Sequence, residues 1–318
     1  MSRRLSRREL VALMAAGMVG GARRSAARIA MRRGVVGVAG ESPDDADPGA
    51  PRRAMERAVR GAMGVATAAE GLAGLFGPSD TVGLKLNCLA GPRLSPRPVL
   101  VEALVDLLAE AGVSRRKIIV FERSSRELER AGFKIRRSGG PYLCYGTDNA
   151  WDRRPSVSGA IGSCFAAEVS TTCSALISFG VVKDHDLAGV SAGMKNWYGV
   201  IHNPNKYHDT NCDPYVADVM RHPFIADKLR LTVLDGVHAQ CQGGPAFFGP
   251  GIFPLGRVAV STDPVAADLW AWQIIEKERA RRGLPTLESE QRAPSFIATA
   301  TGYGLGVGDP ESLRVVEA

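Results

Sequence analysis

The chain has 318 residues, of which 45% are hydrophobic and 23% charged, and this composition is ordinary for a globular protein. Its formal net charge of +7 is unevenly distributed, because residues 1–33 hold nine arginines and one acid, a net +8 that leaves the remainder at −1. A near-neutral body excludes a polyanion-binding surface as the main feature, so we expect no nucleic-acid partner.

The six cysteines are scattered along the chain, and none forms a CxxC pair. Zinc ribbons and cysteine-ligated iron–sulfur clusters usually show such close pairs. Free thiols in the core are the simplest interpretation, because unpaired cysteine is among the most buried residue types.

Residues 1–33 have the layout of an export signal, with a basic start, a short apolar middle and small residues near 25–30. The adjacent Arg7 and Arg8 resemble the twin-arginine class, whose pathway carries folded and often cofactor-loaded proteins. The apolar stretch LVALMAAGMVGGA is too short and glycine-rich for a stable membrane anchor. We therefore expect the twin-arginine translocation machinery as a partner and a periplasmic or other extracytoplasmic location. A basic amphipathic helix and an extended start upstream of the true one stay open as alternatives.

Residues 34–51 are interpreted as a linker, because SPDDADPGAP is acidic and contains proline, and one folded domain is expected over 52–318. Within this domain, TVGLKLN at 81–87 predicts a strand and the leucine spacing of 99–112 predicts a helix. KIIVF at 117–121 predicts the next strand. Strand, helix and strand at this spacing form a βαβ unit, which requires parallel pairing.

Residues 139–162 are weakly patterned and are expected to form a surface insertion. The later predicted elements are a strand at 175–182, a helix over 213–230 that Pro223 interrupts, strands at 231–235 and 257–261, and a helix that begins at Pro264. We therefore predict an α/β fold with a mostly parallel central sheet flanked by helices, a Rossmann-like three-layer arrangement in one unit or in two lobes.

Polar side chains follow the ends of several predicted strands, and the ends of parallel strands share one edge of a sheet. The candidates are Lys85 and Asn87, Lys183 and His185, Asp235, and Asp263. Ligands of open α/β sheets bind at this edge, so these groups are expected to line one cleft. For Asp263 the alternative is an N-cap of the following helix.

The stretch 182–214 holds three of the five histidines, together with lysine, aspartate and cysteine. His185, His202, His208 and Cys212 supply nitrogen and sulfur atoms for a transition metal. Their spacing matches no zinc motif such as HExxH, and the alternative is a hydrogen-bond network that stabilises loops. The sequence does not identify the metal or another cofactor.

The lysines are the candidates for catalysis or anion binding. A lysine near a metal or a second cation has a lowered pKa and acts as a base or covalent anchor, and otherwise it binds an anion as a point charge. Small residues precede Lys195, so we expect it to reach a ligand and its replacement by alanine to cost little stability. The full set of predicted catalytic residues is Lys85, Lys183, Lys195, Asn196 and Asp235, and the predicted cofactor-binding residues are Asn87, Ser191, Gly193 and Asp263.

Four segments together resemble the DUF362 family: GLKLNCLAG, VKDHDLAGVSAGMKNWYG, LTVLDG followed by GGP, and STDPVAAD. The tract IHNPNKYHDTNCDPY, the segment SSRELERAGF and the arginine-pair leader resemble the exported, twin-arginine subgroup of that family. The resemblance implies an α/β fold and no established reaction. Some relatives carry a ferredoxin-like CxxCxxC segment, which this chain lacks.

These observations lead to competing functional hypotheses. The first is an exported enzyme that depends on a metal or another cofactor and acts on a small anionic substrate in the strand-end cleft. The second is a non-catalytic protein that binds a metal or redox cofactor with the same residues. A third is a structural or interaction protein whose polar clusters only fix loops.

Overall fold

The computed structural model describes residues 31–41 and 47–318 of the chain. Residues 1–30 of the predicted twin-arginine signal lie outside the described residues, as do residues 42–46 of the predicted linker. Among the residues described, no helix combines the length and the apolar character needed to cross a membrane.

The strands are β1 (Val35–Gly40), β2 (Val82–Leu86), β3 (Ile118–Glu122), β4 (Leu143–Gly146), β5 (Ser156–Ser158), β6 (Ile161–Ser163), β7 (Ala175–His185), β8 (Gly189–Ser191), β9 (Leu229–Gln240), β10 (Ile252–Ser261) and β11 (Arg314–Glu317). The α-helices are α2 (Ala50–Met63), α3 (Ala68–Leu75), α4 (Pro98–Glu110), α5 (Ser125–Arg130), α6 (Tyr215–Arg221), α7 (Pro223–Ala226), α8 (Pro264–Arg281) and α9 (Phe296–Gly302). Short turns of helix used below are η3 (Lys195–Val200), η4 (Pro204–Tyr207), η5 (Thr210–Cys212) and η6 (Gly249–Gly251).

The described part of the chain forms one nine-stranded central sheet, in the order β11-β1-β10-β9-β7-β2-β3-β4, with β8 added to β7. Strands β9, β7, β2, β3 and β4 pair in parallel, whereas β10 runs antiparallel to both β9 and β1. The predicted α/β fold with a mostly parallel sheet is therefore confirmed. Nine of the described strands form one continuous sheet rather than the sheets of two separate lobes, and β5 and β6 form a separate two-stranded sheet.

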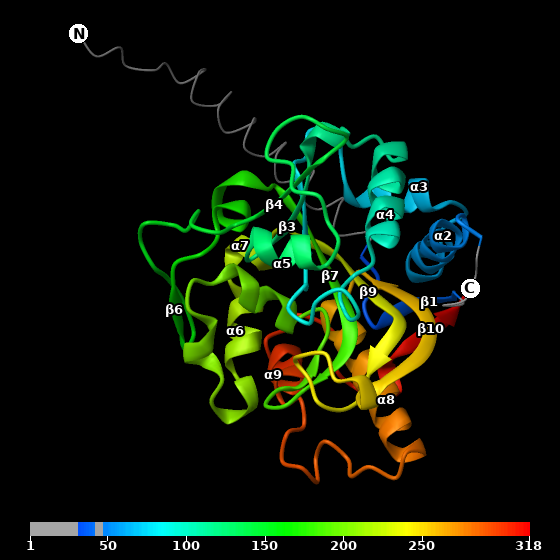
Figure 1. The fold of residues 1–318 in the computed structure, drawn as a ribbon, viewed down its shortest axis with the longest axis vertical. Coiled ribbons are helices and arrows are strands. Elements are labelled where there is room, and N and C mark those ends of the chain that lie inside the picture. Colours follow the sequence, from blue (N-terminus) through cyan, green and yellow to red (C-terminus); the bar gives the residue numbers. More distant parts are fainter. Residues whose placement is uncertain (1–30, 42–46) are drawn as a thin grey trace, which may run out of the picture.

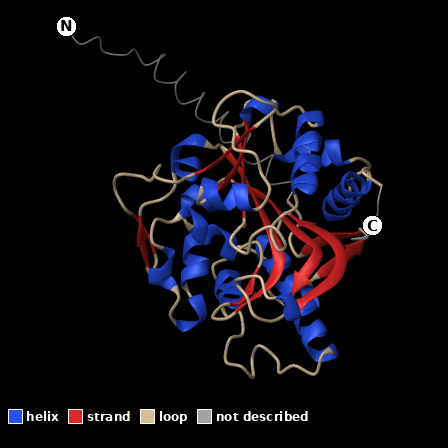
Figure 2. Cartoon of the chain, viewed as in Figure 1, coloured by secondary structure: helices blue, strands red, loops and turns tan. Residues whose placement is uncertain are grey.

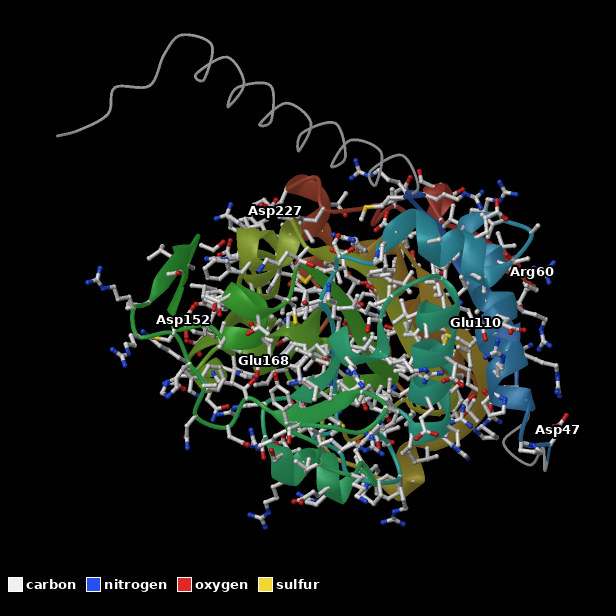
Figure 3. All side chains as sticks on the ribbon, turned by 90° about the horizontal axis from the view of Figure 1, so that it is seen from above. Asp47, Arg60, Glu110, Asp152, Glu168 and Asp227 are labelled. Atoms are coloured by element: carbon white, nitrogen blue, oxygen red, sulfur yellow. The ribbon has the colours of Figure 1, made fainter. Side chains whose placement is uncertain are left out.

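Helices cover both faces of the sheet, as the ribbon and the secondary-structure colouring show (Figures 1 and 2). Helices α2, α3 and α4 contribute to one apolar core with the strands. Helix α8 packs on the other face, where α6 and α9 join a second core. Charged side chains, such as Arg60 of α2 and Glu110 of α4, lie on the outer surface of the helices (Figure 3).

The prediction of a linker over 34–51 is wrong for its first part, because β1 lies inside the sheet between β10 and β11. Val35, Val36 and Val38 are buried there, and no charged residue interrupts the strand. Gly37 allows α2 to approach closely, since a Cβ atom at this position would lie 2.1 Å from the Ala58 carbonyl oxygen. Folded structure therefore begins before the acidic stretch.

Two other expectations concern residues 139–162 and the helix predicted over 213–230. Residues 139–162 are not only a surface insertion, because β4 joins the parallel edge of the sheet beside β3 and buries Cys144. The interruption expected at Pro223 is confirmed, since α6 ends at Arg221 and α7 begins at Pro223. Proline has no N–H to donate, so it begins a new helix more readily than it continues one.

Candidate functional site

The carboxyl end of β7 carries the centre of the candidate site. All eleven residues of β7 are buried, so its last three residues, Lys183, Asp184 and His185, bring ionisable side chains into the protein interior. These residues extend past the end of β2 and pair with β8 instead. The structure thus brings Lys183 and His185 together at the sheet edge where the sequence predicted a ligand site.

Lys183 is completely buried and has no carboxylate partner among the described residues. Its Nζ donates to the Pro245 carbonyl oxygen at 3.0 Å and lies 3.5 Å from Asn87 Oδ1. The Asn87 amide lies 3.5 Å from Ser191 Oγ, so two predicted cofactor-binding residues lie beside this lysine. Burial lowers the pKa of Lys183 to about 8.

Lys195 begins η3 and is also buried, with 6% of its surface exposed. Its Nζ lies 3.2 Å from His208 Nε2 and 3.5 Å from the centre of the Tyr198 ring. Burial lowers the pKa of Lys195 to about 8, and the charge of Lys183 acts in the same direction. The expectation that alanine at this position costs little stability assumed a surface lysine and is not supported by this burial.

His185 and His208 each have a defined tautomer. His185 Nδ1 accepts the backbone N–H groups of Leu187 and Ala188 at 3.1 and 3.2 Å, which leaves its proton on Nε2. His208 Nδ1 lies 3.0 Å from the Pro204 carbonyl oxygen, which can only accept, so Nε2 is free to accept from Lys195. Burial lowers the pKa of both imidazoles, and both are therefore neutral at pH 7.

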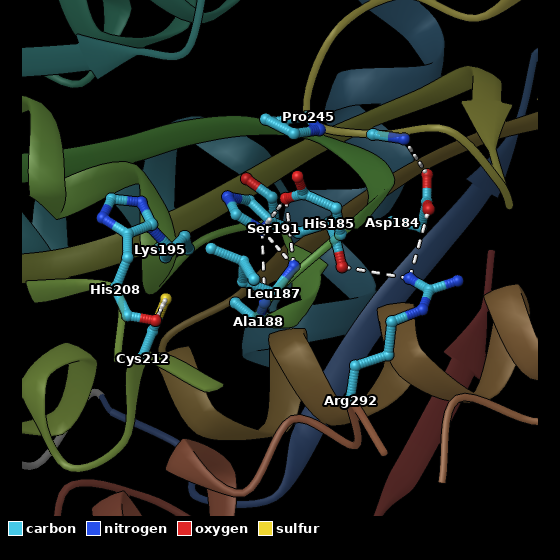
Figure 4. A network of polar contacts seen from close by, with 12 residues as sticks. Asp184, His185, Leu187, Ala188, Ser191, Lys195, His208, Cys212, Pro245 and Arg292 are labelled. Atoms are coloured by element: carbon cyan, nitrogen blue, oxygen red, sulfur yellow. Dashed lines mark hydrogen bonds and ion pairs between the residues drawn. The ribbon is translucent and has the colours of Figure 1, made fainter. Parts of the chain in front are cut away.

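Lys183, His185, Lys195 and His208 are called the lysine–histidine cluster below. The His185 and His208 rings stack with their centroids 5.9 Å apart. Figure 4 shows Lys195 and His208 on one side of His185, with Asp184 on the other. Asp186 approaches His185 Nδ1 to 3.0 Å, but its carboxylate is mostly exposed and both atoms accept the same Leu187 N–H. No carboxylate of the described residues lies within ion-pair distance of either lysine amine, and Asp184 and Asp186 act on the lysine pKa values only from further away.

The prediction that His185, His202, His208 and Cys212 converge on one metal ion is wrong. His202 is exposed and lies edge-on to Trp151, in a separate cavity beyond β3 and β4. Cys212 is a buried thiol whose Sγ contacts the His208 carbonyl oxygen, and burial raises its pKa. Within residues 31–41 and 47–318, no three His, Cys, Asp or Glu side chains are placed to hold a metal.

Lys85 and Asn196, both predicted as catalytic, form hydrogen bonds with each other. Lys85 Nζ donates to Glu122 Oε1 at 3.1 Å, to Asn196 Oδ1 at 3.2 Å and to the Leu86 carbonyl oxygen at 2.6 Å. The Asn196 amide donates to the Lys85 carbonyl oxygen and to Ser178 Oγ. These contacts tie η3 to the sheet and leave few free donors for a ligand.

Asp235 lies within β9, which continues past the predicted strand end to Gln240, and it is held by Arg97, whose backbone N–H and Nε both donate to its Oδ2 at 3.0 Å. Arg97 also forms a two-point pair with Glu41. Asp235 lines a second cavity, described below, and is an anchor for the loop before α4.

Asp263 lies at the opposite edge from the cluster, because β10 runs antiparallel to β9. Its carboxylate accepts the backbone N–H groups of Val265, Ala266, Gly34 and Val307, so it caps α8 and fixes β1. The cap interpretation is the one that the structure shows, and the expectation that Asp263 shares one cleft with the other strand ends is wrong.

Gly193, one of the predicted cofactor-binding residues, allows close packing of its turn against α8 and β9. Its N–H donates to Asp268 of α8 at 2.7 Å, and a Cβ atom would lie 2.5 Å from the Thr232 side chain. Asp268 also accepts the Met194 N–H, and burial raises the pKa of its carboxyl to about 7. This contact holds the turn before Lys195 against α8.

Sequence reasoning missed Arg292, Asp184 and Glu122. Arg292 donates to Asp184 Oδ2 at 3.3 Å and to the His185 carbonyl oxygen at 3.0 Å (Figure 4). Asp184 also accepts the Gly244 N–H, which fixes the loop after β9. Arg292 lies in a loop after α8, where no sequence pattern marks it. Glu122 directly follows the predicted strand at 117–121, so it could have been included among the polar strand-end residues.

Comparison with known proteins agrees with the family resemblance. A crystal structure of a protein from Thermotoga maritima aligns with 12% identity and a TM-score of 0.39, over 67% of this chain and 58% of that chain. No curated protein matches. The sequence model described as "Domain of unknown function (DUF362)" matches residues 82–273, which is more than half of the chain. The chain therefore belongs to the DUF362 family.

Proposed function

We propose that this protein is an enzyme that binds a small anionic substrate at the lysine–histidine cluster. One observation carries the proposal: Lys183 and Lys195 are two buried amines without a carboxylate partner among the described residues. Burying an unpaired ammonium group costs on the order of several kcal/mol. A bound anion offsets that cost, and the ligand-free protein instead lowers the pKa of both amines.

The groups around the two lysines are suited to an anion and poorly suited to a cation. Nε2 of His185 carries a proton, and the Asn87 amide and Ser191 hydroxyl add further donors near Lys183. The charges of Lys183 and Lys195 both lower the pKa of His185, which shows that the two amines act on the same small region. Hydrogen bonds from charged donors to anions are stronger than those between neutral groups.

The same geometry gives Lys195 a chemical role. With a pKa of about 8, a fraction of its amine is neutral near pH 7 and is available as a base or nucleophile. His208 Nε2 accepts from this amine and is positioned to receive its proton. We assign Lys183 to anion binding and Lys195, with His208, to proton transfer or covalent attachment.

The test is calorimetric titration of the full chain with inorganic phosphate and with acetate. Lys183→Met and Lys195→Met remove the charge and keep the length of the side chain, and each should weaken anion affinity by about tenfold or more. Lys206→Met, an exposed lysine of η4, is the matched control and should leave affinity unchanged. Equal affinity in all four proteins would overturn the proposal.

Lys195→Arg separates chemistry from charge. Arginine keeps the positive charge but cannot supply a neutral amine, because its pKa stays above about 12. We expect Lys195→Arg to retain part of the anion affinity and to lose covalent or base activity. The covalent role is checked by borohydride trapping with 2-oxo acids and mass spectrometry. A trapped adduct elsewhere than Lys195 would contradict the assignment.

We also propose that residues 1–33 direct export of the folded protein by the twin-arginine pathway. The described part of the chain contacts the body from Met31, which packs against the apolar core, and Arg32 N–H donates to Thr262 Oγ1 at 2.8 Å. Replacing Arg7 and Arg8 with lysines should block export while the melting temperature stays unchanged. A protein that starts at Met31 should fold normally, and export that survives the double replacement would remove this proposal.

A further inference from the structure

We infer that the substrate is an organic anion with an apolar body, and that a cavity between the loop after β2 and the loop after β9 holds this body. The inference rests on the function proposed above and names the class of substrate. It concerns a cavity that the sequence did not reveal.

The cavity has a volume of about 490 Å³, which lies in the range of small-molecule sites. Its apolar wall is formed by Leu94, Val181, Phe247 and Ile252. These side chains come from the loop after β2, from β7, from the loop after β9 and from β10. A wall of this composition favours a hydrocarbon or aromatic group over an inorganic ion.

The two loops that line the cavity also contact the lysine–histidine cluster, although no residue of the cluster lines the cavity itself. The loop after β2 begins at Asn87, beside Lys183, and continues to Leu94 in the cavity. The loop after β9 contacts Lys183 through Pro245 and reaches the cavity two residues later at Phe247. Figure 1 shows these cyan and yellow loops at the same end of the sheet.

Strand β7 joins the two places directly. Val181 lines the cavity and Lys183 lies two residues further along the strand, so their side chains point to the same face of the sheet. Two residues of strand span about 6.6 Å, which is the length of a short linking chain between an anionic group and an apolar body.

The charged side chains at the cavity, Arg93, Arg97, Asp235 and Glu41, sum to zero. Arg97 pairs with both Asp235 and Glu41, a group of net charge −1. Arg93 stacks over the Phe247 ring at 3.8 Å and forms no ion pair among the described residues. The cavity thus offers an aromatic surface with an unpaired positive charge, and we commit to a carboxylate with an aromatic or branched aliphatic body as its occupant.

Gly249 provides a variant that fills the cavity with little strain. It lines the cavity, is exposed, and has no positive φ, and a Cβ atom would meet only Phe247 ring atoms at 3.8 and 3.9 Å. Gly249→Phe therefore blocks the cavity and leaves the lysines untouched. Gly162→Phe is the matched control, because Gly162 has open space around its Cβ position on β6.

The experiment compares acetate with 3-phenylpropionate by calorimetry on the full chain. We expect 3-phenylpropionate to bind at least about tenfold more tightly than acetate, since its ring is removed from water. Gly249→Phe should abolish this gain and leave acetate affinity unchanged, and Gly162→Phe should change neither. Lys183→Met should weaken both ligands.

The outcomes separate the two proposals. If both ligands depend on Lys183 but bind equally, or if Gly249→Phe keeps the gain, the cavity is not the site of the apolar body and the inference fails. If 3-phenylpropionate binds equally well to the wild type and to Lys183→Met, the anion is not held by the cluster and the proposed function fails. Loss of the gain in Gly249→Phe but not in Gly162→Phe, together with weaker binding of both ligands to Lys183→Met, supports both proposals.

Discussion

Two groups of buried lysines lie at the same edge of the sheet and differ in their partners. Lys85 forms an ion pair with Glu122, and both side chains are almost fully buried. Lys183 and Lys195 contact a carbonyl oxygen, an amide, an imidazole and an aromatic ring instead. The first lysine is paired with a carboxylate within the protein, whereas the other two form no ion pair among the described residues, and the proposed anion would supply that partner.

The difference follows from the neighbouring strands. Lys85 on β2 lies opposite Phe121 of β3, and Glu122 follows as the next residue of that strand. Lys183 lies beyond the end of β2, and its neighbour on β9 is the uncharged Gln240. Parallel pairing of β2 with β3 therefore places the Glu122 carboxylate beside Lys85, whereas the strand next to Lys183 has no carboxylate at the paired position.

The largest effect is expected when the paired lysine loses its partner. Glu122→Leu leaves Lys85 as an uncompensated buried cation and should lower the free energy of unfolding by about 3–5 kcal/mol. Urea unfolding at pH 7 measures this loss. The double variant Lys85→Met with Glu122→Leu should recover much of it. A loss below about 1 kcal/mol in Glu122→Leu would show that the pair is not an internal charge balance.

A smaller effect is expected from the unpaired lysines, and it depends on pH. Their pKa falls from 10.5 in the unfolded chain to about 8 in the folded protein. Between these values the unfolded state binds more protons, so stability rises as the pH increases from 8 to 10.5. The rise should be on the order of 1–3 kcal/mol per lysine.

Unfolding free energies at pH 7.5, 9 and 10.5 check this rise. The double variant Lys183→Met with Lys195→Met should lack it, because neither position then titrates, and Lys206→Met should keep it. If the double variant shows the wild-type slope, the two lysines are not desolvated as described, and the contrast with Lys85 disappears.

The smallest effect is expected at the opposite edge. Asp263→Ala removes the N-cap of α8 and should cost about 1 kcal/mol in thermal or urea unfolding, with Asp263→Asn closer to wild type. Anion affinity should stay unchanged in both variants, because β10 places this residue away from the cluster. A variant that folds stably but loses anion binding would move the site toward Asp263.

Much of the fold and part of the site follow from local sequence. Buried strands have continuous apolar runs, and ALISFGVV before Lys183 marks β7 without any tertiary information. The βαβ spacing of 81–121 sets parallel pairing, so the shared edge of Lys85 and Lys183 is predictable. Short-range patterns carry this information because helices and strands bury side chains with fixed periods.

The tertiary structure alone decided which of these polar strand ends come together in the lysine–histidine cluster. The antiparallel direction of β10 placed Asp263 away from the other strand ends, and pairing with both β10 and β11 brought β1 from the predicted linker into the sheet. Glu122 lies 37 residues from Lys85, and Arg292 lies 108 residues from Asp184. Such partners depend on chain direction and packing across the sheet, which no local spacing records, and so whether a buried lysine is neutralised or left free is a property of the fold.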